Sequence, residues 1–409
     1  MKINLKKTKK AAVALANLSE NKLNLFLDNL ARGINDRKQE ILKANKIDVI
    51  SAKNKGLSQP FIQRLIFDSR AIDNMQKRIK KLKKLKSGIG EIIQKNKNED
   101  GLITQKVRVP LGVLLVIYES RPEVTIDVAA LCLKSGNAVI LKGGSEVNRT
   151  NKVLYECIRI ALRRTGMPKE SVNMIRSRSE VRQMLTKNND IDLIIARGSY
   201  GMVKSIMESS KIPVLAHAAG GARIFVDKSA DVEMAERIIL NAKISKPAVC
   251  NSVDTIVVHK KIAKKLISKI VPALLSKSVK VIGDSNVNKL VKVNIAKETD
   301  WDTEFLGLTI SIKIVKDSIE AAEFINKHSK KHSEGVIATD KRVIKHFTHA
   351  IDCAAVFVNC SPRLHDGYVF GLGAEMGIAT GKLHARGPVG LKELTTYKWE
   401  IYGKGQIRK

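Results

Sequence analysis

The chain has 409 residues of ordinary apolar content, which favours two or three domains with large cores and excludes wholesale disorder. No apolar run approaches the roughly 18 residues that span a bilayer, and the five widely spaced cysteines form neither a CxxC pair nor a zinc-type cluster, so we expect a cytoplasmic protein without a metal site. Lysine and arginine outnumber the acidic residues by 73 to 40, and the net charge of +33 leaves a nucleic-acid-binding protein open as an alternative.

Residues 8–86 are predicted to be helical throughout, because apolar residues recur at helical spacing. They include the densest basic run, residues 77–86, in which Ile79, Leu82 and Leu85 share one stripe. This run lacks aromatic side chains on which bases could stack. We therefore interpret it as the solvated face of a helix and expect neither a membrane partner nor a specific nucleic acid.

From residue 107 the pattern changes to an alternation of short apolar strands and helices. We predict strands at 113–118, 138–142 and 191–196, and helices at 122–134, at 145–164 and from 202 onward. Buried strands joined by helices are typical of a parallel sheet covered on both faces. The predicted fold class is therefore α/β.

A second series of the same kind begins near Thr255. We predict strands at 255–258, 309–315, 335–338 and 354–358, and helices at 260–275, 317–328 and 341–350. Ligands of such sheets bind near the carboxyl ends of the strands. The sequence therefore predicts two parallel-sheet domains.

Two glycine-containing turns follow predicted strands of the first series. One is Lys142-Gly143-Gly144-Ser145, and the other includes Gly198 and Ser199. Glycines at a strand-to-helix turn let a phosphate approach the backbone, and the free N–H groups of the helix favour an anion. Neither turn matches the GxGxxG fingerprint or a P-loop, so each taken alone is more typical of a tight turn. Together they favour a dinucleotide.

Cys250 lies in the polar segment Lys246-Pro247-Ala248-Val249-Cys250-Asn251, between a predicted helix and a predicted strand. A cysteine in a stiff polar loop can be reached by a substrate, as a nucleophile must be. Cys132 and Cys157 instead lie on apolar helix faces and are predicted to be core residues. Loop context alone leaves a functional and a structural Cys250 equally open.

A polar loop near the C-terminus carries His384 and Arg386, followed by Gly387-Pro388. The planar fork of an arginine held in a rigid loop can clamp a carboxylate or a phosphate. A surface loop is the simpler interpretation of this segment when it is considered alone.

Six blocks of sequence carry a resemblance to a known family. They are Val109–Gly112 (VPLG), Tyr118–Pro122 (YESRP), Leu131–Glu146 (LCLKSGNAVILKGGSE), PAVCN around Cys250, Trp301–Leu306 (WDTEFL) and Phe370–Trp399 (FGLGAEMGIATGKLHARGPVGLKELTTYKW). Over nearly its whole length the chain resembles the gamma-glutamyl phosphate reductases, also called glutamate-5-semialdehyde dehydrogenases, of the aldehyde dehydrogenase superfamily.

The resemblance implies NADPH-dependent reduction of L-glutamyl 5-phosphate to L-glutamate 5-semialdehyde in proline biosynthesis, with release of phosphate. The Cys250 thiolate would form a thioester, which accepts hydride more readily than a carboxylate. The resemblance also implies a homo-oligomer and a transient contact with glutamate 5-kinase. The implied site residues are Cys250 and Asn251 for catalysis, Arg386, Arg121 and His384 for substrate, and Lys142, Gly143, Ser145, Gly198, Ser199 and Glu304 for the cofactor.

The same resemblance implies a domain arrangement. Residues 1–245 would form the cofactor-binding domain, 246–380 the catalytic domain, and 381–409 a return segment with an oligomerisation tail. A hairpin near residues 100–110 would join that tail in a small β flap.

The chain also departs from the family pattern. Glu123 stands where many relatives carry Asn, Ala222-Arg223 where Cys-His is usual, and Ala196 where Pro is usual. An oxidative aldehyde dehydrogenase acting on another small aldehyde is the alternative enzyme. It would need a general base to activate water, and Ala219-Gly220-Gly221 carries no adjacent glutamate.

Overall fold

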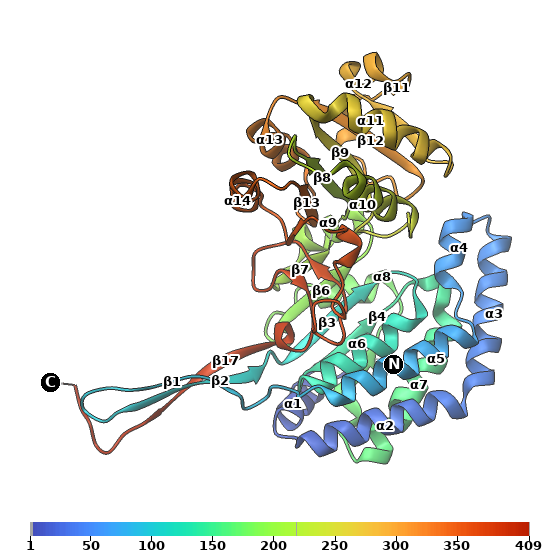
Figure 1. The fold of residues 1–409 in the computed structure, drawn as a ribbon. Coiled ribbons are helices and arrows are strands. Elements are labelled where there is room, and N and C mark those ends of the chain that lie inside the picture. The colour runs from blue at the N-terminus through green and yellow to red at the C-terminus, as the bar shows by residue number, and fades with distance from the viewer. Residues whose placement is uncertain (1–2, 218, 409) are drawn as a thin grey trace. The chain divides into compact units, whose positions relative to one another are not determined.

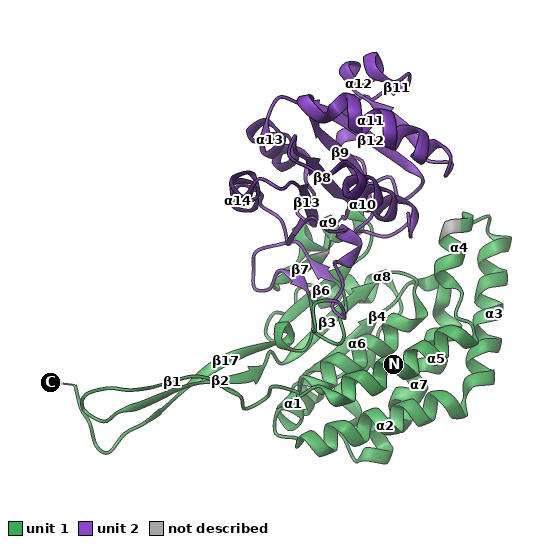
Figure 2. Cartoon of the chain, viewed as in Figure 1, with its two compact units in different colours: residues 1–216, 370–377, 389–409 green, residues 217–369, 378–388 purple. Residues whose placement is uncertain are grey.

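The computed structural model describes residues 3–217 and 219–408, and it divides into two compact units (Figure 2). Unit 1 comprises residues 1–216, 370–377 and 389–409, and unit 2 comprises residues 217–369 and 378–388. The division thus falls at 216/217, whereas the sequence predicted 245/246. The reason is that strand β8 (Ala222–Val226) pairs with strands of the second sheet rather than the first.

Unit 1 begins with five helices, in agreement with the prediction for residues 8–86. They are α1 (Leu5–Ala16), α2 (Glu20–Asp36), α3 (Lys38–Asn54), α4 (Gln59–Leu65) and α5 (Ser69–Lys84). A buried carboxylate ties this layer to the next one. Asp48 of α3 accepts hydrogen bonds from the Thr150 N–H at 2.9 Å and from its Oγ1 at 2.8 Å.

A five-stranded sheet lies beside these helices in the order β5-β4-β3-β6-β7 (Figure 1). Its strands are β3 (Val113–Tyr118), β4 (Ala138–Lys142), β5 (Val172–Met174), β6 (Leu193–Arg197) and β7 (Val214–His217), and its helices are α6 (Pro122–Lys134), α7 (Asn148–Thr165), α8 (Arg178–Met184) and α9 (Tyr200–Ser209). The pairs β3–β4, β3–β6 and β4–β5 are parallel, and every residue of β3 and β4 is buried. This confirms the predicted parallel sheet.

The chain of unit 1 also forms a three-stranded antiparallel sheet that extends away from the helices of the unit (Figure 1). Its order is β1 (Ile92–Lys97), β2 (Ile103–Pro110) and β17 (Thr395–Tyr402). The hairpin predicted near residues 100–110 and its pairing with the C-terminal tail are therefore confirmed. Every residue of β1 is exposed, so this sheet has no core of its own along that strand.

Unit 2 is a seven-stranded sheet in the order β11-β10-β12-β9-β8-β13-β14, and its recorded pairs are parallel. Besides β8, its strands are β9 (Val253–His259), β10 (Lys280–Gly283), β11 (Asn294–Ile295), β12 (Thr309–Val315), β13 (Ser333–Ile337) and β14 (Ala355–Val358). Its helices are α10 (Val232–Ile244), α11 (Lys260–Leu275), α12 (Ser285–Leu290), α13 (Ser318–His328) and α14 (Lys341–Ala350). A short pair, β15 (Ile378–Ala379) with β16 (Gly387–Pro388), completes the unit.

Helices cover both faces of this second sheet. Ile224 and Val226 of β8 pack with α10 and α11 in one apolar cluster, whereas Phe225 belongs to a second cluster with Phe347 of α14. Successive residues of a strand point to opposite faces. The apolar runs of the sequence are therefore explained by burial on both sides.

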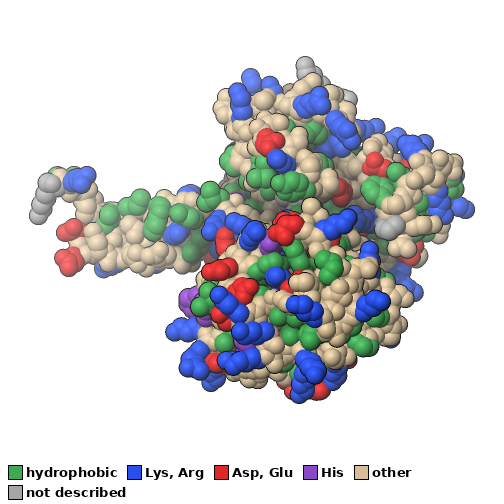
Figure 3. All heavy atoms as spheres, turned by 90° about the horizontal axis from the view of Figure 1, so that it is seen from above, with side chains coloured by type: hydrophobic (Ala, Val, Ile, Leu, Met, Phe, Trp, Pro, Cys, Tyr) green, Lys and Arg blue, Asp and Glu red, His purple; other side chains and the backbone are tan. Residues whose placement is uncertain are grey.

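Basic side chains are scattered over the face seen in Figure 3, where acidic side chains lie among them. They do not gather there into one continuous stripe of the kind that tracks a nucleic-acid backbone. Among the described residues, no helix is both long and apolar enough to cross a bilayer.

Candidate active site

Cys250 lies in the loop between α10 and β9 of unit 2, and a second backbone segment is packed directly against it. The Gly221 N–H donates a hydrogen bond to the Cys250 carbonyl at 2.5 Å. A Cβ added to Gly220 would overlap the Cys250 backbone, with its Cα at 2.5 Å. Only glycine therefore fits at position 220, and the close contact fixes the backbone that carries the thiol.

Burial raises the pKa of each of the other four cysteines, and Cys250 is partly exposed. The pKa of Cys157 is raised to about 11 and that of Cys353 to about 12. A nucleophilic cysteine must reach the thiolate form and must be accessible. Cys353 and Cys360 are partly exposed as well, so exposure alone does not distinguish Cys250; its loop position and the raised pKa of the other four thiols do.

The side chain of Asn251 is buried and joins the Cys250 loop to a turn after β14. Its Nδ2 group donates to the carbonyls of His365 at 3.1 Å and Arg363 at 3.4 Å, and its Oδ1 accepts from Arg363 Nη1. Both amide hydrogens are already used, which leaves none for a substrate oxyanion. The geometry favours Asn251 as the residue that positions Arg363.

Arg363, in the short 3₁₀ helix Pro362–Leu364, is the charged residue that the sequence interpretation missed. Its Nε donates to Ser245 Oγ at 3.2 Å, so both ends of the Cys250 loop hold it. Burial lowers the pKa of Arg363. Because the guanidinium is hydrogen-bonded to Asn251, the residue next to Cys250, it lies beside the Cys250 loop. The sequence feature that could have indicated Arg363 is the polar Ser-Pro-Arg turn that follows an apolar strand.

Arg386 is fixed by a carboxylate. Its Nη1 donates to Asp352 Oδ1 at 2.7 Å, and Lys331 and Lys382 also pair with Asp352. The hydrogen bond from Arg386 holds the pKa of Asp352 well below its usual range. Arg386 Nε and Nη2 are buried, and within the described chain neither has a hydrogen-bond partner. The Asp352 contact thus holds one side of the fork in place, while His384 of the same loop is exposed.

In unit 1, the glycines of the first turn are required by packing. A Cβ on Gly143 would lie 2.5 Å from Asn151 Nδ2, and a Cβ on Gly144 would lie 2.9 Å from Glu146 Oε2. Lys142 is 9% exposed and donates to the Gly143 carbonyl at 2.6 Å, and burial lowers its pKa. Ser145 is exposed and donates to Glu146 at 2.9 Å.

A pocket of about 380 Å³ lies beside this turn and has a basic rim. It is lined by residues of α3 and α7 together with Ser145, and its cations are Lys55, Arg149, Lys152 and Arg176. Cations beside a strand-to-helix turn are what a phosphate-bearing nucleotide requires. The residues of this region therefore fit the nucleotide end of a cofactor.

The second glycine-containing turn, which includes Gly198 and Ser199, differs from the first because a carboxylate of the protein itself lies at its helix N-terminus. The Ser199 N–H, at the start of α9, donates to Glu119 Oε1 at 2.6 Å. A Cβ on Gly198 would lie 2.8 Å from the Glu119 side chain. The helix N-terminus that the sequence assigned to a cofactor phosphate is thus occupied by a carboxylate.

The predicted site residues fall into two sets. Unit 2 contains Cys250, Asn251, Glu304, His384 and Arg386. Unit 1 contains Arg121, Lys142, Gly143, Ser145, Gly198 and Ser199. Arg121 is the N-cap residue of α6, and its N–H donates to the Glu119 carbonyl at 2.8 Å.

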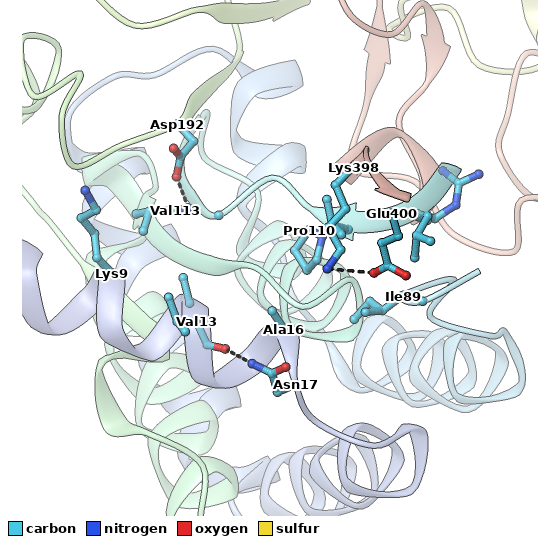
Figure 4. Close-up of a pocket in the computed structure, with 16 residues that line it drawn as sticks. Lys9, Val13, Ala16, Asn17, Ile89, Pro110, Val113, Asp192, Lys398 and Glu400 are labelled. Atoms are coloured by element: carbon cyan, nitrogen blue, oxygen red, sulfur yellow. Dashed lines mark hydrogen bonds and ion pairs between the residues drawn. The ribbon is translucent and has the colours of Figure 1, made fainter. Parts of the chain in front are cut away.

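A further pocket, of about 440 Å³, lies in unit 1 where α1 meets the root of the three-stranded sheet (Figure 4). Asp192 Oδ2 accepts from the Val113 N–H at 2.7 Å, and Lys398 pairs with Glu400 at 2.9 Å. The lining contains none of the predicted site residues and no cysteine. We therefore do not assign the chemistry to it.

Comparison with known proteins identifies relatives along the whole chain. The aldehyde dehydrogenase family profile matches residues 2–293. A gamma-glutamyl phosphate reductase from Carboxydothermus hydrogenoformans is 43% identical over 406 residues and covers 98% of both chains. The same enzyme from Caldanaerobacter subterraneus is 42% identical over 412 residues and covers 100% of both chains.

Solved structures agree with the sequence comparison. The crystal structure of gamma-glutamyl phosphate reductase from Thermotoga maritima superposes with a TM-score of 0.96 at 41% identity, covering 99% of both chains. An acetylating aldehyde dehydrogenase from Geobacillus thermoglucosidasius, 16% identical, shares the fold with a TM-score of 0.69. The predicted aldehyde dehydrogenase-like α/β fold is confirmed.

The cysteine environments predict selective alkylation. Brief treatment with iodoacetamide at neutral pH should modify Cys250 first, because burial raises the pKa of the other four thiols. Peptide mass spectrometry would locate the label, with Cys250→Ser as the control that should remain largely unlabelled. Faster labelling of Cys353 or Cys360 would contradict the assignment.

Proposed function

The chain belongs to the aldehyde dehydrogenase family and, within it, to the gamma-glutamyl phosphate reductases, and from this premise we propose that it reduces L-glutamyl 5-phosphate to L-glutamate 5-semialdehyde with release of phosphate. The reaction is a step of proline biosynthesis. Similarity to reductases of that name over at least 98% of the chain is the observation that carries the proposal.

Cys250 is the proposed nucleophile. Its thiolate attacks the acyl carbon, the bond from that carbon to the phosphate oxygen breaks, and inorganic phosphate leaves from a thioester. A bound nicotinamide cofactor supplies the hydride that reduces the thioester carbonyl. The carbon–sulfur bond then breaks, which releases the aldehyde and regenerates the thiolate.

The backbone around Cys250 supports this chemistry. Because the Gly221 N–H holds the Cys250 carbonyl, the orientation of the peptide is set before substrate arrives. We propose that the Cys250 N–H stabilises the oxyanion that forms on attack. Arg363, which is hydrogen-bonded to the adjacent Asn251, would stabilise the departing phosphate as a charge-assisted donor.

The oxidative alternative requires a base that activates water for thioester hydrolysis. The segment that packs on Cys250 is Ala219-Gly220-Gly221-Ala222, and it offers no carboxylate. Phosphate, rather than water, is therefore the acyl acceptor that we propose for the reverse reaction.

For the cofactor we propose NADPH. The basic rim around Ser145, together with Lys142, supplies the cations that a 2′-phosphate would need. Glu304 is the proposed ligand of the cofactor in unit 2. All five thiols are free, which suits the reducing cytoplasm that we propose as the location.

We also propose a homo-oligomer that is built through the β1-β2-β17 sheet. Trp399 is 47%, Tyr402 53% and Ile401 60% exposed, although all are large apolar residues. Open edges and exposed apolar side chains of this kind are normally covered by a partner. A transient contact with glutamate 5-kinase, which would deliver the unstable acyl phosphate, is proposed from the chemistry of that substrate.

The reverse reaction tests the proposed function. With glutamate semialdehyde and NADP⁺, formation of NADPH should depend on added phosphate and should be abolished in Cys250→Ala. The reason is that phosphate must resolve the thioester. Absorbance at the nicotinamide band is the measurement. Phosphate-independent formation of NADPH would instead identify a hydrolytic aldehyde dehydrogenase.

Arg386→Lys keeps the charge but loses the planar fork. We expect kcat/KM for gamma-glutamyl phosphate to fall about tenfold or more, while alkylation of Cys250 proceeds at nearly the wild-type rate. Arg363→Lys is the comparison variant, and it should lower kcat more than it raises KM. Wild-type kinetics in Arg386→Lys would assign its loop to structure and leave Arg363 or Arg121 as the clamp.

Lys142→Ala should weaken binding of NADPH much more than binding of NADH, because a contact between a cation and a phosphate is lost. Calorimetric titration of both cofactors gives the comparison. Equal losses would mean that Lys142 does not recognise the 2′-phosphate, and Arg149 and Arg176 would then be tested in its place.

Trp399→Glu should reduce the oligomer mass in light scattering, because a charge would be placed on the proposed contact sheet. Leu275→Glu, at an exposed apolar position of similar exposure in α11, is the matched control and should leave the mass unchanged. An unchanged mass in both variants would exclude this sheet as the interface.

A further inference from the structure

Four charged side chains lie buried together behind the Cys250 loop of unit 2. Arg223 of β8 is 1% exposed, Lys243 of α10 is 0%, Asp254 of β9 is 2% and Glu334 of β13 is 0%. Removing an ion from water costs several kcal/mol, and apolar residues of similar size often give an equally stable core. Stability alone therefore does not explain this cluster, which we call the buried quartet.

The quartet pairs its charges internally. Arg223 Nη1 lies 3.6 Å from Glu334 Oε1, and the Arg223 N–H donates to Glu334 Oε2 at 2.8 Å. Lys243 Nζ lies 3.4 Å from Asp254 Oδ1. Burial raises the pKa of Asp254 to about 6 and that of Glu334 to about 7, and the neighbouring cations oppose both shifts.

Arg223, Lys243 and Asp254 each make a further hydrogen bond to one loop, residues 301–308, while Glu334 Oε1 accepts from Ser329 Oγ at 2.6 Å. Arg223 Nη2 donates to the Trp301 carbonyl at 3.1 Å, and Lys243 Nζ donates to the Gly307 carbonyl at 3.2 Å. Asp254 Oδ1 accepts from the Phe305 N–H at 3.3 Å. Residues 303–308 are neither helix nor strand, so charged side chains hold this backbone where secondary structure does not.

Glu304 lies in the middle of that loop. It is bracketed by the Trp301 contact on one side and by the Phe305 contact on the other. The charge of Glu304 also contributes to the raised pKa of Asp254. The position of Glu304 therefore depends on the side chains of the quartet.

The same quartet contacts the segment that holds Cys250. A Cβ on Gly221 would lie 2.5 Å from Asp254 Oδ2 and 4.0 Å from Arg223 Nη1. The Gly221 N–H donates to the Cys250 carbonyl. One rigid group of charges thus lies behind the nucleophile and also anchors the loop of Glu304.

We propose that Arg223, Lys243 and Asp254 are positioning residues that fix Glu304 relative to Cys250, so that the cofactor is held where the thioester forms. This inference rests on the proposed function, because it takes Glu304 to bind the nicotinamide cofactor. Displacement of the reacting groups by about 1 Å can cost a hundredfold in rate, which gives the buried charges a role besides packing.

A double-mutant cycle on cofactor affinity tests the proposal without any turnover. Titration calorimetry with NADPH should show a dissociation constant about five- to tenfold higher in Glu304→Ala and in Asp254→Ala. Adding Asp254→Ala to Glu304→Ala should change it by no more than about twofold, because residues that act through one another are not additive. Asp254→Asn, which keeps an acceptor for the Phe305 N–H, should recover part of the affinity.

Lys134→Met is the matched control. Lys134 is a buried cation of unit 1, and it is also paired with a carboxylate, that of Glu20. This variant should lower the melting temperature as the quartet variants do and leave the NADPH dissociation constant unchanged. If Asp254→Ala does not fold, Lys243→Met takes its place in the cycle.

Additive losses in the double variant, or wild-type affinity in either single variant, would overturn the positioning role. Failure of the phosphate-dependent assay with wild-type protein would instead reject the proposed function. The two failures are distinguishable because the calorimetric cycle needs cofactor alone.

Discussion

The contact between Gly221 and Cys250 is the constraint on which the rest of unit 2 depends. The two residues before β8, Gly220 and Gly221, contact the Cys250 backbone, and β8 then pairs with β9. No side chain fits there, because a Cβ on Gly220 would overlap the cysteine backbone. The sheet that builds the core of the unit therefore also fixes the nucleophile.

The arginines of the chain illustrate two uses of one guanidinium. Arg363 is half-buried, burial lowers its pKa, and it is hydrogen-bonded to Asn251 and Ser245. Arg223 is almost fully enclosed, and its contacts go to backbone and to Glu334. Arginine is suited to both environments because it keeps its charge and offers a planar set of donors. Other basic side chains are scattered over the face seen in Figure 3.

The backbone beside Cys250 also favours acyl-phosphate chemistry over hydrolysis. The Gly220-Gly221 segment that packs on the cysteine backbone carries no side chain, so it supplies no base for water. The fold is nevertheless shared with an acetylating aldehyde dehydrogenase of only 16% identity. Which reaction an enzyme of such a fold catalyses is decided by a few side chains around the thiol rather than by the architecture.

The sequence by itself determined the strands and helices with strong periodicity, such as 113–118 and 260–275. Burial of one or both faces of an element requires apolar residues at a regular spacing, and this spacing can be recognised within a short stretch of sequence. It also indicated Cys250, through its loop and the PAVCN block. It predicted a boundary at 245/246, whereas the compact units divide at 216/217, since the sheet to which β8 belongs is decided by strand pairing across distant segments. Arg363 and the Asp352 partner of Arg386 were missed for the same reason. Their roles depend on side chains more than 30 residues away along the chain, and only tertiary packing brings such groups within hydrogen-bonding distance.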